Sequence, residues 1–77
     1  MSDRNVMFQS LATHATAVAR ADRALGIVPL DATGEIDPVA ITEAAQIVLS
    51  RMAASVDDDD FEELINAWSN AYYSAAT

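Results

Sequence analysis

The chain lacks most of the devices that stabilise very small proteins. It has no cysteine and a single histidine among its 77 residues, so it can form neither a disulfide nor a structural zinc site. A domain of this length buries only about 60% of its unfolded surface. Many of its hydrophobic residues are alanine, which contributes little transfer free energy when buried. We therefore expect oligomerisation or a partner protein to supply further buried area.

A long apolar run is also missing. No stretch approaches the roughly 20 apolar residues that a membrane span requires, and no basic segment followed by an apolar run begins the chain. The absence of cysteine is compatible with a reducing compartment. These features predict a soluble, cytoplasmic protein with no membrane contact.

Positive charge is scarce, with four basic residues against twelve acidic ones and a net charge of -8. From Asp31 onward, Arg51 is the only basic residue. This asymmetry argues against direct binding of nucleic acids or anionic membranes, which would be repelled. It favours a larger basic protein, or an arginine-bearing surface of a second copy, as the partner. The charge alone also serves to keep an alanine-rich protein soluble.

Apolar residues recur at helical spacing in three segments, so the chain predicts an all-α fold, a small three-helix single domain over residues 1–77. The clearest segment runs from about Asp58 to Ala75, with Ser55 or Asp57 as its N-terminal cap. Its apolar stripe follows offsets of three, four and seven residues. The stripe consists of Phe61, Leu64, Ile65, Trp68, Ala71, Tyr72 and Ala75.

A long first helix is predicted from Asp3 to Leu25, with Gly26 positioned to terminate it. Apolar residues along it repeat in alternating steps of four and three, which is a heptad-type pattern. We call this pattern the first-helix seam and expect it to form a homodimer or hetero-complex contact. Its members are Met7, Leu11, His14, Val18 and Leu25.

Between the first two helices, residues 26–37 predict an extended connector that straps across the helices, because Ile27, Val28, Leu30 and Ile36 are too apolar to remain together in water. Asp37 followed by Pro38 predicts the start of the second helix, which should end near Ala54. Its buried stripe is predicted to be Ile41, Ala44, Ala45, Val48 and Met52, with Ile47 beside it.

No catalytic, cofactor or metal site is predicted. His14 lies on an apolar seam without an acid or nucleophile nearby in sequence, so we interpret it as a seam or interface histidine. The aspartate run from Asp57 to Asp60 lacks the EF-hand spacing, and consecutive helical aspartates point in different directions. The protein is therefore expected not to be an enzyme.

The acyl carrier proteins are similar in length, charge and helix count. Their prosthetic-group serine lies in an Asp-Ser-Leu motif at the start of the second helix, where this chain has Asp37, Pro38 and Val39. Proline in place of serine leaves no attachment point for phosphopantetheine. The likeness is one of bulk properties only.

The residues expected to contact a partner are an acidic patch around the start of the third helix and one tyrosine among amides. They are Asp57, Asp58, Asp59, Asp60, Glu62, Glu63 and Tyr73. The acidic run equally has a structural interpretation, as a helix start that keeps the protein soluble. For Tyr73, packing beneath the connector is the alternative to exposure.

Two functions fit these features. The first is a small acidic inhibitor or adaptor that covers a basic surface of a larger protein, which could itself handle nucleic acids. Phage-encoded anti-defence proteins and antitoxin-like regulators share this size and charge. The second is a self-associating structural subunit whose acidic face is merely solvated.

Overall fold

The computed structural model describes residues 3–51 and 58–77, with side chains described for 5–51 and 60–77. Three helices follow one another: α1 (Asp3–Leu25), α2 (Pro38–Arg51) and α3 (Asp58–Ala76). Within the described residues the only strand-like feature is an isolated antiparallel bridge between Leu30 and Ile36. The predicted all-α fold with a long first helix is confirmed. The molecule is elongated, measuring 40 × 19 × 17 Å.

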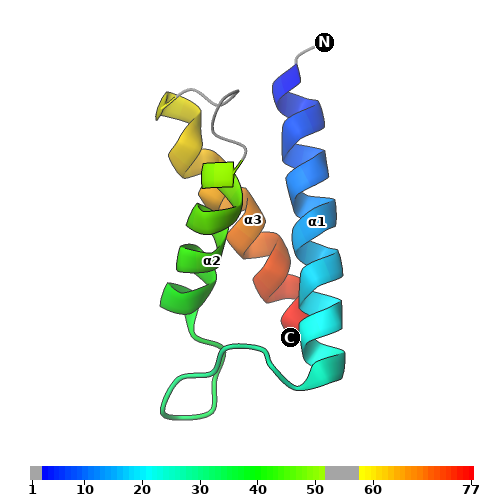
Figure 1. Cartoon of the computed structure of the whole chain (residues 1–77), viewed down its shortest axis with the longest axis vertical. Helices are drawn as coiled ribbons and strands as arrows, with labels where there is room; N and C mark the ends of the chain where they lie inside the picture. The colour runs from blue at the N-terminus through cyan, green and yellow to red at the C-terminus, as the bar shows by residue number, and fades with distance from the viewer. Residues whose placement is uncertain (1–2, 52–57) are drawn as a thin grey trace.

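α3 is the helix against which both other helices pack. As Figure 1 shows, α1 and α3 run in the same direction and α2 runs in the opposite direction. α3 crosses obliquely behind the other two helices. α3 packs against α1 and against α2, whereas the described parts of α1 and α2 make no close backbone contact with each other. α1 and α2 are therefore held together through α3 and not by direct packing of their backbones.

The core is centred on the α3 stripe, as its spacing predicts. Leu64, Ile65, Trp68 and Tyr72 are buried, and Phe61 packs half-buried against them. α1 meets this stripe with small residues, since Ala15 and Ala19 are fully buried one turn apart beyond the buried Leu11. A pair of alanines four residues apart on one helix face lets two helix backbones approach closely.

α1 ends at Gly26, as predicted, and the local hydrogen bonds show why. Gly26 has a φ of 70°, a conformation that glycine adopts without steric cost. The Gly26 amide donates to the Arg23 carbonyl at 3.2 Å, and the Ile27 amide donates to the Asp22 carbonyl at 2.9 Å. These two bonds form a Schellman motif, which satisfies carbonyls that the helix end would otherwise leave unpaired.

The connector is organised around one aspartate. The Asp31 carboxylate accepts hydrogen bonds from the Thr33 hydroxyl at 2.6 Å, the Thr33 amide at 2.8 Å and the Glu35 amide at 3.1 Å. These bonds, led by the one from the Thr33 side chain, lower the pKa of Asp31 below its usual value. They stabilise the turn in which Gly34 has a φ of 85°.

The connector only partly covers the helices. Val28 and Ile36 pack against the core, but Ile27 and Leu30 are 60% and 58% exposed. The expectation that all four apolar side chains strap the helices is therefore wrong for these two. The tight Asp31 turn closes the segment on itself at one end of the bundle (Figure 1), so its apolar residues cannot all reach the core.

α2 begins as predicted and packs in a slightly different rotation. The Asp37 carboxylate accepts the Val39 amide at 3.0 Å, which is an N-cap hydrogen bond. The buried residues are Ile41, Ala45 and Leu49, whereas Ile47 is 58% exposed. The predicted stripe omitted Leu49 and placed Ile47 beside the core, because a short helix rich in apolar residues offers two overlapping stripes. Met52 and the predicted end near Ala54 lie outside the described residues.

Candidate functional site

Two long-range hydrogen bonds join α1 to α3. The Trp68 indole Nε1 donates to Nδ1 of His14 at 3.1 Å, and the Tyr72 hydroxyl donates to an Asp22 carboxylate oxygen at 2.6 Å. The two aromatic rings stack with centroids 5.3 Å apart. Because buried aromatic N–H and O–H groups need partners, these bonds let Trp68 and Tyr72 be almost completely buried.

The Tyr72 hydroxyl is held in its neutral form. Burial raises the pKa of Tyr72 above its ordinary value, and the hydrogen bond to the negatively charged Asp22 raises it further. Ionisation of the phenol would lose the donated proton and place two negative charges together. The bond therefore has a structural role in holding the C-terminal part of α1 against α3.

His14 is exposed even though its Nδ1 atom is bonded to a buried residue. An acceptor Nδ1 in a neutral imidazole requires the proton to be on Nε2. The Nε2–H group therefore remains a hydrogen-bond donor on the solvent side of the ring. His14 thus links the buried indole of Trp68 to whatever contacts the surface of α1.

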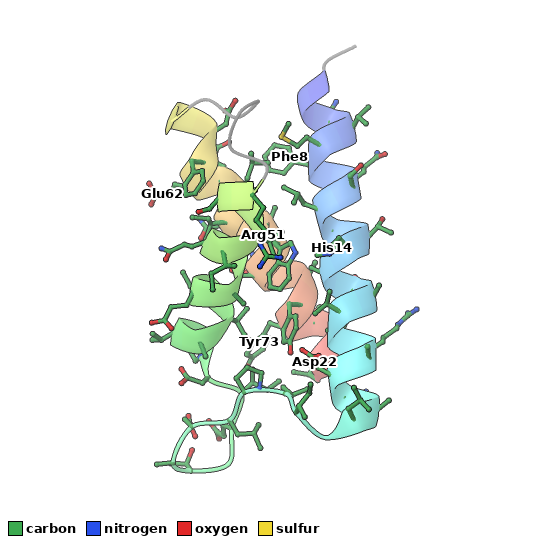
Figure 2. All side chains as sticks on the ribbon, viewed as in Figure 1. Phe8, His14, Asp22, Arg51, Glu62 and Tyr73 are labelled. Atoms are coloured by element: carbon green, nitrogen blue, oxygen red, sulfur yellow. The ribbon has the colours of Figure 1, made fainter. Side chains whose placement is uncertain are left out.

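A groove of about 410 Å³ lies between α1 and α2, lined by Ser10, Leu11 and His14 from α1 and by Val48 and Arg51 from α2. Figure 2 shows Arg51 and His14 reaching from facing helices into the space between them, in front of α3. Leu11 and Val48 supply the apolar lining. Ser10, His14 and Arg51 supply polar groups, each able to donate hydrogen bonds.

Arg51 is the one basic residue after Arg23. Within the described ranges it forms no ion pair, and its side chain is exposed at the groove. The chain has twelve acidic residues, so a guanidinium without an ion pair is unexpected in it. Its position opposite His14 makes the groove the one basic spot on the α2 side of the described structure.

The two other arginines with described side chains have a structural explanation. Arg20 and Arg23 border a shallow depression of about 640 Å³ beside Ser74 and Thr77. This depression lies where the C-terminal ends of the parallel helices α1 and α3 meet. Cations at helix C-termini interact favourably with the helix dipoles, so this depression needs no ligand to account for its charge.

The predicted acidic patch is only partly within the described side chains. Asp57 lies outside the described residues, and Asp58 and Asp59 belong to the first turn of α3 without described side chains. Asp60 is half-buried, while Glu62 and Glu63 are exposed. Figure 2 shows Glu62 pointing away from α1.

Tyr73 is 47% exposed rather than packed beneath the connector. It follows Glu62 by eleven residues, which is close to three full helical turns, so both lie on one face of α3 about 16 Å apart along the axis. Asn66 is also exposed on this side. We call the surface formed by Glu62, Asn66 and Tyr73 the outer face of α3.

The first-helix seam does not form one continuous exposed surface. Leu11 is 1% exposed because it packs within the chain's own core, and Met7 and Val18 are half-buried against that core. His14 and Leu25 remain exposed. Within the seam, these two residues are therefore the ones most available to a second copy.

A second exposed apolar surface lies at the connector end of the bundle. It combines the end of α1, the connector and the start of α2, which lie together in Figure 1. Its large apolar side chains are each more than half exposed. They are Leu25, Ile27, Leu30 and Val39, and we call them the end patch.

The described residues also bear on metal binding and membrane spanning. No three histidine or acidic side chains in that part of the chain are grouped so that they could hold a metal ion. None of the helices, over their described residues, is both long and apolar enough to cross a membrane.

No family model, curated protein or solved structure matches this chain. The groove, the outer face of α3 and the end patch are thus characterised by their chemistry alone.

Proposed function

We propose that the protein is a small acidic binding module that acts by occupancy, as a stoichiometric inhibitor or adaptor covering a basic surface of a larger protein. The contact surface is the outer face of α3 together with the acidic start of that helix. The observation that carries the proposal is the alignment of Glu62 and Tyr73 on one exposed helix face.

The composition of this face supports a protein partner. A partly exposed tyrosine beside amides offers a rigid contact area with a polar tip. The exposed Glu62 and Glu63 add negative charge near the start of α3, and the chain as a whole carries -8. Such a surface attracts a basic partner over long distance and repels polyanions.

A nucleic-acid-handling protein is one kind of partner that fits, because it has an extended basic surface that an acidic module can cover.

The test is a pull-down with mass measurement, using the wild type and two matched variants. Glu62→Gln/Glu63→Gln removes two charges at the start of α3, and Glu35→Gln/Glu43→Gln removes two exposed charges from the connector and α2. We expect the first variant to lose the partner and the second to retain it. Binding should also weaken as salt rises from low to physiological concentration.

Equal loss in both variants would show that total charge, and not the α3 surface, attracts the partner. Capture that ignores both salt and the Glu62→Gln/Glu63→Gln change would reject the acidic-surface mechanism. Helix content must match the wild type in each variant, because acids near a helix start also stabilise it.

The end patch favours a second candidate, a self-associating subunit. Four large apolar side chains exposed together are unusual for a monomer surface and typically mark an interface. In this case a stable oligomeric mass would be measured for the isolated protein. Leu30→Glu should then convert it to a monomer, whereas a binding module that acts alone would be monomeric before the substitution.

A further inference from the structure

The groove between α1 and α2 has a chemistry opposite to that of the rest of the protein. Its polar groups are the Arg51 guanidinium, the outward Nε2–H of His14 and the Ser10 hydroxyl. The first two can only donate hydrogen bonds, and the hydroxyl can donate as well. A group that fits all three must be an acceptor, and the guanidinium favours an acceptor with negative charge.

The remaining lining is apolar. The half-buried Val48 supplies most of the exposed apolar surface, because Leu11, which also borders the groove, is 1% exposed. A volume of about 410 Å³ lies within the range of small-molecule sites, which combine a mostly apolar lining with a few placed polar groups. The groove is therefore suited to a ligand with an apolar body and one anionic end.

The net negative charge of the protein favours a ligand that carries one negative charge over a ligand that carries two. Among the described side chains, Arg51 supplies the one full positive charge at the groove, while the chain carries -8 overall. A phosphate dianion would meet strong repulsion from the surrounding field. A planar carboxylate matches a guanidinium through two parallel hydrogen bonds and adds only one charge.

We propose that the groove binds a small apolar monocarboxylate, such as a medium-chain fatty acid. The carboxylate lies between Arg51 and the Nε2–H of His14, and the hydrocarbon chain packs on the partly exposed Val48. This site is separate from the outer face of α3, so neither proposal depends on the other.

Trp68 provides a direct readout. A carboxylate that accepts the Nε2–H of His14 polarises the ring and strengthens the acceptor Nδ1, which already binds the indole N–H of Trp68 at 3.1 Å. Trp68 is the only tryptophan in the chain. Binding should therefore shift the single indole N–H resonance and the fluorescence of the protein in a saturable way.

The experiment titrates the full chain with octanoate while recording both signals. Octan-1-ol and octylamine, which have the same total number of carbon atoms but no carboxylate, serve as matched ligands. We expect saturation with octanoate, and much weaker responses to the alcohol and the amine. Equal responses to all three would overturn the proposal, because they would show that the groove accepts any apolar chain.

Two arginine variants locate the site. Arg51→Gln removes the positive charge of α2 that lies at the groove. Arg20→Gln removes one positive charge from α1, at the depression outside the groove. A charge-assisted hydrogen bond lost in Arg51→Gln should weaken octanoate binding about 10-fold or more, while Arg20→Gln should bind nearly as well as wild type. Equal weakening in both, or no saturable Trp68 signal in the folded wild type, would reject the site.

Discussion

The two sides of α1 differ in how they meet the rest of the protein. Towards α3, α1 presents Ala15 and Ala19, both fully buried, and two side chains that bond to Trp68 and Tyr72. Towards α2, Ser10 and the exposed part of the same His14 ring that bonds to Trp68 line an open groove. The comparison shows that small residues let helices pack closely, whereas exposed polar side chains without a partner on the opposite helix leave a space.

The difference also separates stability from binding. The α1–α3 contact combines buried aromatic area with satisfied polar groups, so substitutions there should affect folding. The α1–α2 side lacks close backbone packing in the described residues, so substitutions there should affect ligands more than folding. Four substitutions test this division.

Trp68→Ala should have the largest effect, because Trp68 is 1% exposed and contacts both His14 and Tyr72. Truncating a buried aromatic typically costs about 3–5 kcal/mol, which is comparable to the whole stability of a domain of this size. Circular dichroism should show a largely unfolded chain. Tyr73→Ala, on an exposed position of the same helix, should melt almost like the wild type. A cooperative, unshifted melt of Trp68→Ala would contradict the packing described for α3.

Ala15→Leu tests the close approach of α1 and α3. Ala15 is fully buried, so the larger side chain must push the helices apart, at a typical cost of about 1–3 kcal/mol. Ala17→Leu makes the same change at an exposed position of the same helix and should be nearly neutral. Urea unfolding measures both. Equal stabilities for the two variants would mean that α1 can shift on α3 at no cost.

Tyr72→Phe tests the polar part of the same contact. Loss of the hydrogen bond to Asp22 should reduce the free energy of unfolding by about 1 kcal/mol near neutral pH. Because folding raises the pKa of Tyr72, the wild type should keep this contribution below about pH 10, the ordinary tyrosine pKa. It should lose the contribution as the pH rises further, since the unfolded chain then ionises more readily. Urea unfolding at pH 8 and pH 11 should show a smaller alkaline loss in the variant, and an identical loss in both proteins would refute the role of Tyr72.

Val48→Leu should have the smallest effect on folding. Val48 lines the open groove on α2, where space remains for one more methylene, so we expect a change within about 0.5 kcal/mol. The larger enlargement of Ala15→Leu, at a fully buried position, should cost several times more. A strongly destabilised Val48→Leu protein would show that the α1–α2 side is tightly packed, and would remove the contrast on which the groove proposal stands.

Much of the local structure could be predicted because its causes are local. Asp37 caps α2 through a hydrogen bond two residues away, and Gly26 ends α1 by adopting a positive φ. The buried stripe of α3 follows from residue spacing within a single helix. Each of these features depends on residues within a few positions of one another.

Predictions that depended on packing were less successful. Both Val48 and Leu49 are apolar, and only contact with α3 decided that Leu49 is the fully buried one. His14 was predicted to be a seam residue, but its position is determined by a hydrogen bond to Trp68, 54 residues away. The sequence shows that Arg51 is the only basic residue of an acidic region. It does not show that Arg51 lies opposite His14, which depends on the packing of α1 and α2 on α3.

The sequence by itself determined the three helices, the start of α2 at Asp37, the end of α1 at Gly26, the aromatic stripe and the strong negative charge, because hydrogen bonding and side-chain periodicity within a helix act over one or two turns. Only the tertiary structure decided which side of α1 is closed and which is open. That choice depends on how α3 positions two helices whose described backbones make no close contact, and no periodicity within either helix predicts their separation.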